Sequence, residues 1–98
     1  MNEYERLRRQ AEHYKKLYPK GTRILLQHMG NDPRPIDDNM RGTVSYVDDI
    51  GTVHCDFDNG RSLGIVPGED SFRKLTSEEL AEEQENGIDE DNGPVMGM

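Results

Sequence analysis

The sequence contains a single cysteine, Cys55, no tryptophan and only two phenylalanines. One cysteine excludes an intramolecular disulfide, and secreted domains of this size usually depend on such cross-links. Residues 1–9 contain no apolar run, and no later stretch is long enough to cross a membrane. These absences predict a cytoplasmic protein without a signal peptide or a membrane anchor.

Apolar side chains are also scarce, at 32% of the residues against 33% that are charged. Because a chain of 98 residues forms one domain at most, its hydrophobic core must be thin. Most large apolar residues fall in residues 21–75, and few fall in residues 76–98. We therefore expect a small folded body with a disordered end, and a non-catalytic protein without a cofactor.

Basic residues are absent from residues 76–98, which hold eight acidic ones. Residues 1–20 hold six basic and three acidic residues, and residues 21–75 hold six basic and nine acidic, giving a net charge of −8. Binding to a phosphate backbone normally needs a basic surface, so this balance argues against direct nucleic-acid binding. The basic N-terminal segment is the exception.

Residues 3–18 have the pattern of an amphipathic helix. One apolar stripe recurs at helical spacing and consists of Tyr4, Leu7, Ala11, Tyr14 and Leu17. Asn2 followed by Glu5 resembles a capping box, and Pro19 ends the helix. We expect the stripe to pack on the folded body, with a homodimer through the Tyr4–Leu17 stripe as the alternative.

Five short strands are expected over residues 21–28, 41–48, 52–57, 61–66 and 71–75. Residues 29–40 form a long polar loop, and Asn59-Gly60 predicts a tight hairpin with two positive φ angles. Five such strands would curl into a small barrel. The fold class is therefore mainly β: a small SH3-like five-stranded barrel over residues 20–75, an N-terminal amphipathic helix over residues 1–19, and an acidic, largely disordered tail over residues 76–98.

Several short segments resemble a known family. They lie at residues 18–24, 41–44, 47–54, 58–60 and 63–73, and the most specific is the closing Pro-Gly-Glu-Asp-Ser-Phe-Arg. The chain resembles a domain-of-unknown-function family of SH3-like barrels, common in phages, plasmids and conjugative elements of Gram-positive bacteria. The resemblance implies a fold and a mobile-element origin, but no activity. Residues 21–24 and 41–44 also resemble the KOW type of barrel, which often binds nucleic acid or ribosomal protein.

No catalytic or metal-binding pattern stands out. The sequence has no phosphate loop, no calcium loop and no paired cysteines for zinc. His54 and Cys55 are adjacent in a strand, so they point to opposite faces and cannot act together. We expect no catalytic, cofactor-binding or metal-binding residues.

Candidate partner-binding residues lie in the long loop, at Tyr46 and near the turns. They are Asp32, Arg34, Asp37, Asp38, Tyr46, Asp49, Glu69, Asp70 and Arg73. For residues 69–73 a structural role is favoured, in which Phe72 fills the barrel while Asp70 caps backbone amides and pairs with an arginine.

Three functions follow from these patterns as hypotheses. The first is a protein-interaction module encoded on a mobile element, with a protein partner. The second is an acidic inhibitor of a host nucleic-acid-binding defence protein, either anti-CRISPR-like or a DNA mimic. The third is nucleic-acid binding through the basic N-terminal helix.

Overall fold

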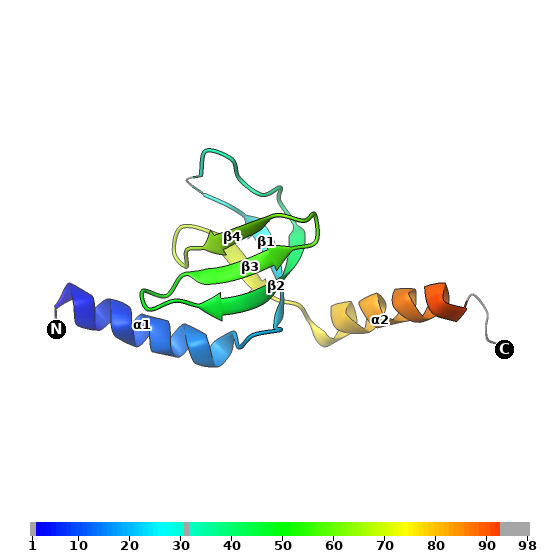
Figure 1. The fold of residues 1–98 in the computed structure, drawn as a ribbon, viewed down its shortest axis with the longest axis horizontal. Coiled ribbons are helices and arrows are strands. Elements are labelled where there is room, and N and C mark those ends of the chain that lie inside the picture. The colour runs from blue at the N-terminus through cyan, green and yellow to red at the C-terminus, as the bar shows by residue number, and fades with distance from the viewer. Residues whose placement is uncertain (1, 31, 93–98) are drawn as a thin grey trace.

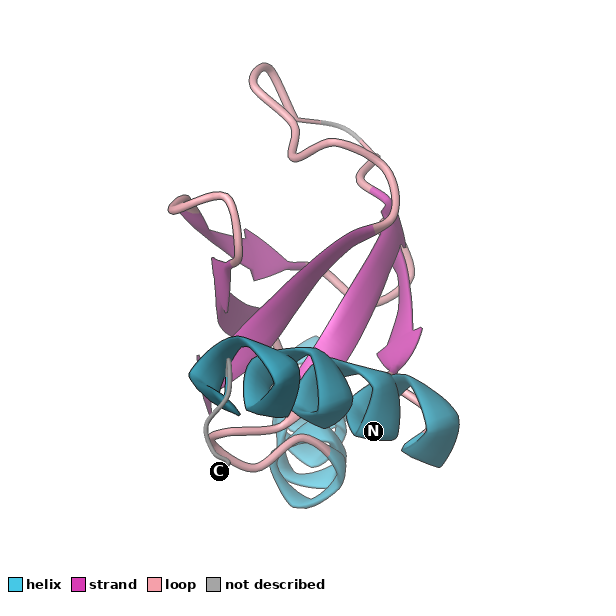
Figure 2. Ribbon diagram, turned by 90° about the vertical axis from the view of Figure 1, so that its right-hand side faces the viewer, coloured by secondary structure: helices cyan, strands magenta, loops and turns pink. Residues whose placement is uncertain are grey.

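Two helices flank a five-stranded antiparallel sheet in the computed structural model (Figure 1). It describes the backbone of residues 2–30 and 32–92, and side chains as far as Glu85. The elements are α1 (Glu3–Leu17), β1 (Arg23–His28), β2 (Met40–Val47), β3 (Val53–Phe57), β4 (Ser62–Ile65), β5 (Ser71–Lys74) and α2 (Ser77–Asn92). Figure 2 shows both helices near one end of the strands and the long loop at the other. The mainly β class and the N-terminal helix are confirmed.

The strands are ordered β4-β3-β2-β1-β5, and each neighbouring pair is antiparallel. Among the described residues β4 and β5 do not pair with each other, so the sheet remains open between its two edges. The strand pattern therefore predicted the number of strands and their limits, but the closed barrel is not confirmed. Pro67 and Asp70 form an isolated bridge in the turn between β4 and β5.

The core lies on one face of the sheet, as the alternation of apolar residues predicted. Its buried members are Ile24, Leu26, Met29, Ile36, Val44, Val47, Val53, Cys55, Phe57 and Ile65. Two of them, Met29 and Ile36, come from the segment predicted to be a polar loop. Ile36 is only 2% exposed, so the loop is anchored at its middle to the core.

A β-bulge in β2 breaks the expected alternation. Val44 pairs with Cys55, but the next register pair is Tyr46 with His54, so Ser45 is the extra residue. As a result Val44 and Val47, three positions apart, are both buried, whereas Tyr46 is 56% exposed. A bulge of this kind re-aims the side chains that follow it.

The hairpin between β3 and β4 differs from its prediction. Gly60 has φ 92°, and Asn39 is the sole non-glycine residue with positive φ in the described chain, so Asn59 does not adopt it. The amide of Phe57 donates to the carbonyl of Arg61, and the amide of Gly60 donates to that of Phe57. This is a three-residue loop with one left-handed glycine, in place of the expected two-residue turn.

Helix α1 packs on its own sheet through the middle of the apolar stripe. It begins at Asn2, whose side-chain oxygen accepts from the amide of Glu5 at 2.8 Å. Ala11 is buried, and Tyr14 packs against the core. The middle of the stripe therefore serves as a docking face, whereas Tyr4 and Leu17 at its two ends are 70% and 38% exposed.

Helix α2 occupies residues that were expected to be largely disordered. Thr76 and Glu79 form a reciprocal capping box: the Thr76 hydroxyl accepts from the Glu79 amide, and the Glu79 carboxylate accepts from the Thr76 amide. This Thr-x-x-Glu signal was present in the sequence. The part of the predicted tail at 93–98 lies outside the described residues. Neither described helix has the length and apolar composition of a membrane-spanning segment.

Ion pairs hold the first turns of α2 to the sheet. Arg73 donates to both carboxylate oxygens of Glu79, at 2.8 and 2.9 Å. One turn further along, Glu83 accepts from Arg23 and, at 3.1 Å, from Arg41. None of the α2 side chains that the structure describes is buried. The helix is therefore attached by charge and not by core packing.

The Arg73–Glu79 contact leads to a prediction about acid. The Arg73 side chain, together with the Thr76 amide, lowers the pKa of Glu79 from 4.5 to about 2. Because the pKa is lowered on attachment, the contact contributes above pH 4.5 and is lost as the pH falls towards 2. In Arg73→Gln we expect the pKa of Glu79 to rise towards 4.5, measured by NMR titration of its carboxyl carbon.

Lys74→Gln is the matched control, because it removes the same charge from the same strand. The Lys74 ammonium lies over the Tyr18 ring, 5.5 Å from its centroid, so it should leave the pKa of Glu79 unchanged. An unaltered Glu79 titration in Arg73→Gln would show that the ion pair is not formed.

Candidate interaction surface

Tyr46, His54 and Gly64 form a row across the outer face of β2, β3 and β4. The Tyr46 and His54 rings stack, with centroids 4.4 Å apart and planes inclined by 12°. A Cβ at Gly64 would come within 3.3 Å of the His54 ring and within 2.6 Å of the Thr52 methyl. A glycine at this position therefore gives the His54 ring the space that it occupies against Tyr46.

Asp48 fixes the orientation of the His54 ring. One of its carboxylate oxygens lies 2.8 Å from His54 Nε2, and the other accepts from the amides of Ile50 and Thr52. Burial raises the pKa of Asp48, but the hydrogen bonds from His54 and from the two amides outweigh it, so the pKa is lowered. The β2–β3 turn and the aromatic pair thus form one hydrogen-bonded unit.

A carboxylate lies beside the aromatic pair. Asp56 accepts hydrogen bonds from the hydroxyls of Ser45 and Ser62, at 3.2 and 2.7 Å. Together these residues line a shallow hollow of about 390 Å³, whose wall consists of Ser45, Tyr46, His54, Cys55, Asp56, Ser62, Leu63 and Gly64. The hollow extends to β4, an edge strand of the sheet. We call this area, defined by Tyr46, His54 and Asp56, the aromatic–acidic surface.

The predicted loop residues do not join this surface. The Asp32 side chain accepts from the Arg34 amide at 2.8 Å, and Asp38 pairs with His28 at 2.9 Å. The Arg61 guanidinium donates to the backbone carbonyls of Arg34 and Pro35, which ties the loop to the β3–β4 turn. Asp37 is exposed. Their role as partner-binding residues stays a prediction.

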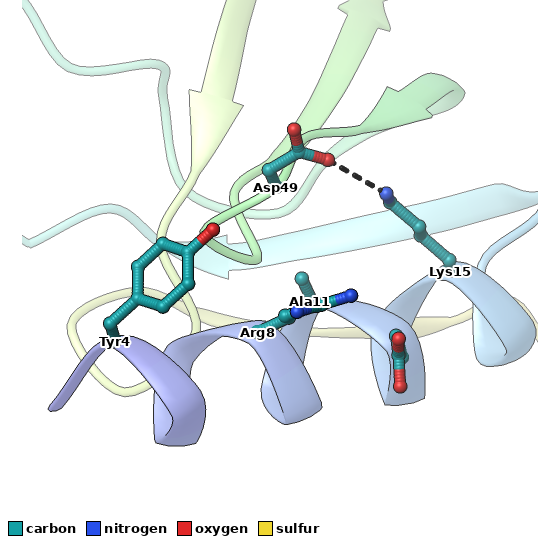
Figure 3. A pocket seen from close by; sticks show the side chains of 6 residues that line it. Tyr4, Arg8, Ala11, Lys15 and Asp49 are labelled. Carbon is teal, nitrogen blue, oxygen red and sulfur yellow. Dashed lines mark hydrogen bonds and ion pairs between the residues drawn. The ribbon is translucent and has the colours of Figure 1, made fainter. Parts of the chain in front are cut away.

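Asp49 lies in a second hollow, between α1 and the β2–β3 turn (Figure 3). Its carboxylate accepts from the Lys15 ammonium at 3.0 Å. The wall consists of Tyr4, Arg8, Ala11, Glu12, Lys15 and Asp49. Charges of both signs alternate here, and the hollow follows the seam where α1 docks on the body, so we regard it as part of that packing.

Asp70 has a structural role, as the sequence suggested. Its two carboxylate oxygens accept from the amides of Gly30 and Val66, at 2.6 and 2.8 Å. The Asp70 side chain therefore joins the loop after β1 to the turn after β4. The amides take the place of the predicted arginine partner. Phe72 packs against the core, and its ring centroid lies 5.2 Å from that of Tyr18. Glu69 is exposed.

Among the described residues no three His, Cys, Asp or Glu side chains gather as they would around a metal ion. Burial, with a smaller contribution from the charge of Asp56, raises the pKa of Cys55 to about 12. A thiol with so high a pKa stays protonated at neutral pH and is a poor nucleophile. Cys55 therefore acts as a small core residue.

A comparison with protein families decides the classification. Residues 7–75, more than half of the chain, match the family called domain of unknown function DUF4314. The chain belongs to this family. The DUF4314 match includes all five strands and ends before α2. No curated protein matches the chain.

Sequence reasoning missed two members of the aromatic–acidic surface. His54 and Asp56 are not among the partner-binding residues that the sequence predicts. Their proximity to Tyr46 depends on the β-bulge in β2, which the alternation of apolar and polar residues does not predict. The DUF4314 domain thus presents a surface that only the register of β2 and β3 reveals.

Asp70→Ala tests the structural role of that side chain. The substitution leaves the amides of Gly30 and Val66 without their acceptor, and we expect a loss of about 1–2 kcal/mol in the free energy of unfolding. Urea denaturation measures the loss. Glu69→Ala, at the exposed neighbouring position, removes the same charge and should leave the midpoint nearly unchanged. Equal midpoints for the two variants would contradict the role of Asp70.

Proposed function

We propose that this DUF4314 protein is a non-catalytic protein-interaction module that binds a basic, extended segment of a partner protein. The observation that carries the proposal is the stacked pair of Tyr46 and His54: the His54 ring is hydrogen-bonded to Asp48, and the Tyr46 ring is open to solvent. Nothing in the hydrophobic core requires an aromatic ring at position 46, which lies 56% exposed on the outer face.

The chemistry of the surface favours a cationic ligand. An arginine or lysine can lie over an aromatic face, and an adjacent carboxylate such as Asp56 can accept its hydrogen bonds. The edge of β4 can add an extended peptide by backbone pairing.

The finer classification belongs to the same proposal. The strand order β4-β3-β2-β1-β5, with a long loop after β1 and short connections afterwards, supports an SH3-like barrel. The resemblance of residues 63–73 supports an origin on a phage or another mobile element. A single buried cysteine supports the reducing environment of the cytoplasm.

A second candidate function is an acidic inhibitor of a nucleic-acid-binding protein. Beyond its first turns helix α2 extends away from the sheet (Figure 1), and its carboxylates at Glu78, Glu82 and Glu85 are exposed. Such an array could imitate the charge of a nucleic-acid backbone. Under this function, replacement of the three residues by glutamine would weaken inhibition sharply at low salt, whereas binding at the aromatic–acidic surface would not change.

A peptide library displayed on phage tests the interaction module. The full chain should select extended peptides rich in arginine and lysine, and Tyr46→Ala should weaken binding of a selected peptide by about tenfold or more. Fluorescence anisotropy with the labelled synthetic peptide measures the change. Asp56→Asn should also weaken binding, because it removes the negative charge beside the rings.

Tyr4→Ala is the matched control, since it removes an exposed tyrosine from α1 and should leave affinity unchanged. Selected peptides without an excess of basic residues would contradict the proposed ligand. Equal affinities of the Tyr46→Ala and Tyr4→Ala variants would contradict the proposed surface.

A further inference from the structure

Three arginines share the outer face of β1, β2 and β5. Leu25 in β1 pairs with Arg41 of β2 on one side and with Arg73 of β5 on the other. The side chains of Leu25, Arg41 and Arg73 therefore lie on the same face of the sheet. Arg23 is two residues before Leu25 and therefore points the same way. The face opposite the core thus carries a cluster of guanidinium groups at Arg23, Arg41 and Arg73, which we call the arginine cluster.

Helix α2 covers the arginine cluster through two carboxylates one turn apart. Glu79 binds Arg73, and Glu83 binds both Arg23 and Arg41. Glu79 and Glu83 are 21% and 27% exposed, and they are the most covered of the α2 side chains that the structure describes. The helix thus contacts the arginines through negatively charged groups, in the way that a bound anion would.

This cover is separate from the folded domain. The family match ends at residue 75, so the arginine cluster lies inside the DUF4314 domain and α2 lies beyond it. None of the α2 residues whose side chains the structure describes belongs to the hydrophobic core. Its attachment depends on partly exposed ion pairs, which are individually weak and are screened by salt.

We propose that the arginine cluster is a binding surface for the phosphate backbone of a nucleic acid, and that α2 occupies it in cis. Residues 1–75 contain twelve basic and twelve acidic residues, whereas all eight acidic residues of 76–98 belong to the covering segment. Residues 1–75 thus have no net charge, and three of their eight arginines lie together on one face of the sheet. The net charge of the whole chain conceals this surface.

A phosphate backbone can bind more than one guanidinium group of the cluster at once. A guanidinium group binds phosphate, like carboxylate, with two parallel hydrogen bonds. Arg41 and Arg73 stand on β2 and β5, on either side of β1 and thus two strand spacings of about 4.8 Å apart, so they can contact separate phosphates of one backbone. Asp58 also pairs with Arg23, at 2.8 Å, and stays in place when α2 leaves. Arg41 and Arg73 are therefore the two groups that become free. This surface is distinct from the aromatic–acidic surface, and its failure would not affect the proposed function.

Two double variants of α2 test the proposal with matched charge. Glu79→Gln/Glu83→Gln uncovers the arginines, and Glu78→Gln/Glu82→Gln changes the net charge equally but alters two exposed positions. The probe is a short fluorescein-labelled single-stranded DNA, and anisotropy gives its affinity. We expect the first variant to bind at least about tenfold more tightly than the second at low salt, with a slope of log affinity against log salt near −1.4 for two phosphates.

Further variants decide where the DNA binds. Adding Arg41→Gln or Arg73→Gln to Glu79→Gln/Glu83→Gln should reverse the gain, whereas adding Tyr46→Ala should not. Circular dichroism shows whether each variant remains folded. Because Arg41 and Arg73 are replaced in separate variants, the test still holds if one of the two variants does not fold. Equal affinity of the two glutamine variants would overturn the proposal. Tighter binding of a polyglutamate peptide than of DNA by the uncovered variant would also overturn it, because the ligand would then be an acidic protein.

Discussion

The β-bulge at Ser45 is the constraint on which the two faces of the sheet depend. Without it, strict alternation from Val44 would bury Tyr46 and expose Val47. With it, Val47 completes a thin core and Tyr46 is aligned with His54 on the outside. The core of a domain of this size is small, so the burial of Val47 matters for stability. The same register that buries Val47 places the Tyr46 ring in solvent.

The sequence predicts the elements of this fold well, because each depends on local patterns. The strand limits agree with the structure to within two residues, and the stripe on α1 packs as expected through Ala11 and Tyr14. The features that could not be predicted depend on pairing between distant segments. Neither the open edge between β4 and β5 nor the burial of Ile36 follows from composition, since both require knowing where the strands and the loop meet.

The candidate site shows the same division. The position of Asp70 after a Pro-Gly turn predicts a capping role, and the hydrogen bonds that it accepts from the amides of Gly30 and Val66 confirm that role. The grouping of His54 and Asp56 with Tyr46 depends on the register between β2 and β3, which the sequence does not show. The length of α2 is not predictable in the same way, because its composition is acidic and because Arg23 and Arg41, which pair with Glu83, lie far away in the sequence.

Net charge is a poor guide to the partner of such a chain. Charge acts over about a Debye length, roughly 8 Å at physiological ionic strength, so a ligand responds to the charges near its own site. On this outer face one half presents Asp56 beside two rings, and the other presents three arginines whose charge is cancelled by a helix outside the core. Removing the same number of carboxylates from α2 can therefore leave the arginines covered or expose them, depending only on which side of the helix loses them. For this domain, the sign of the surface that a ligand meets depends on where α2 lies, and the total of −8 does not determine it.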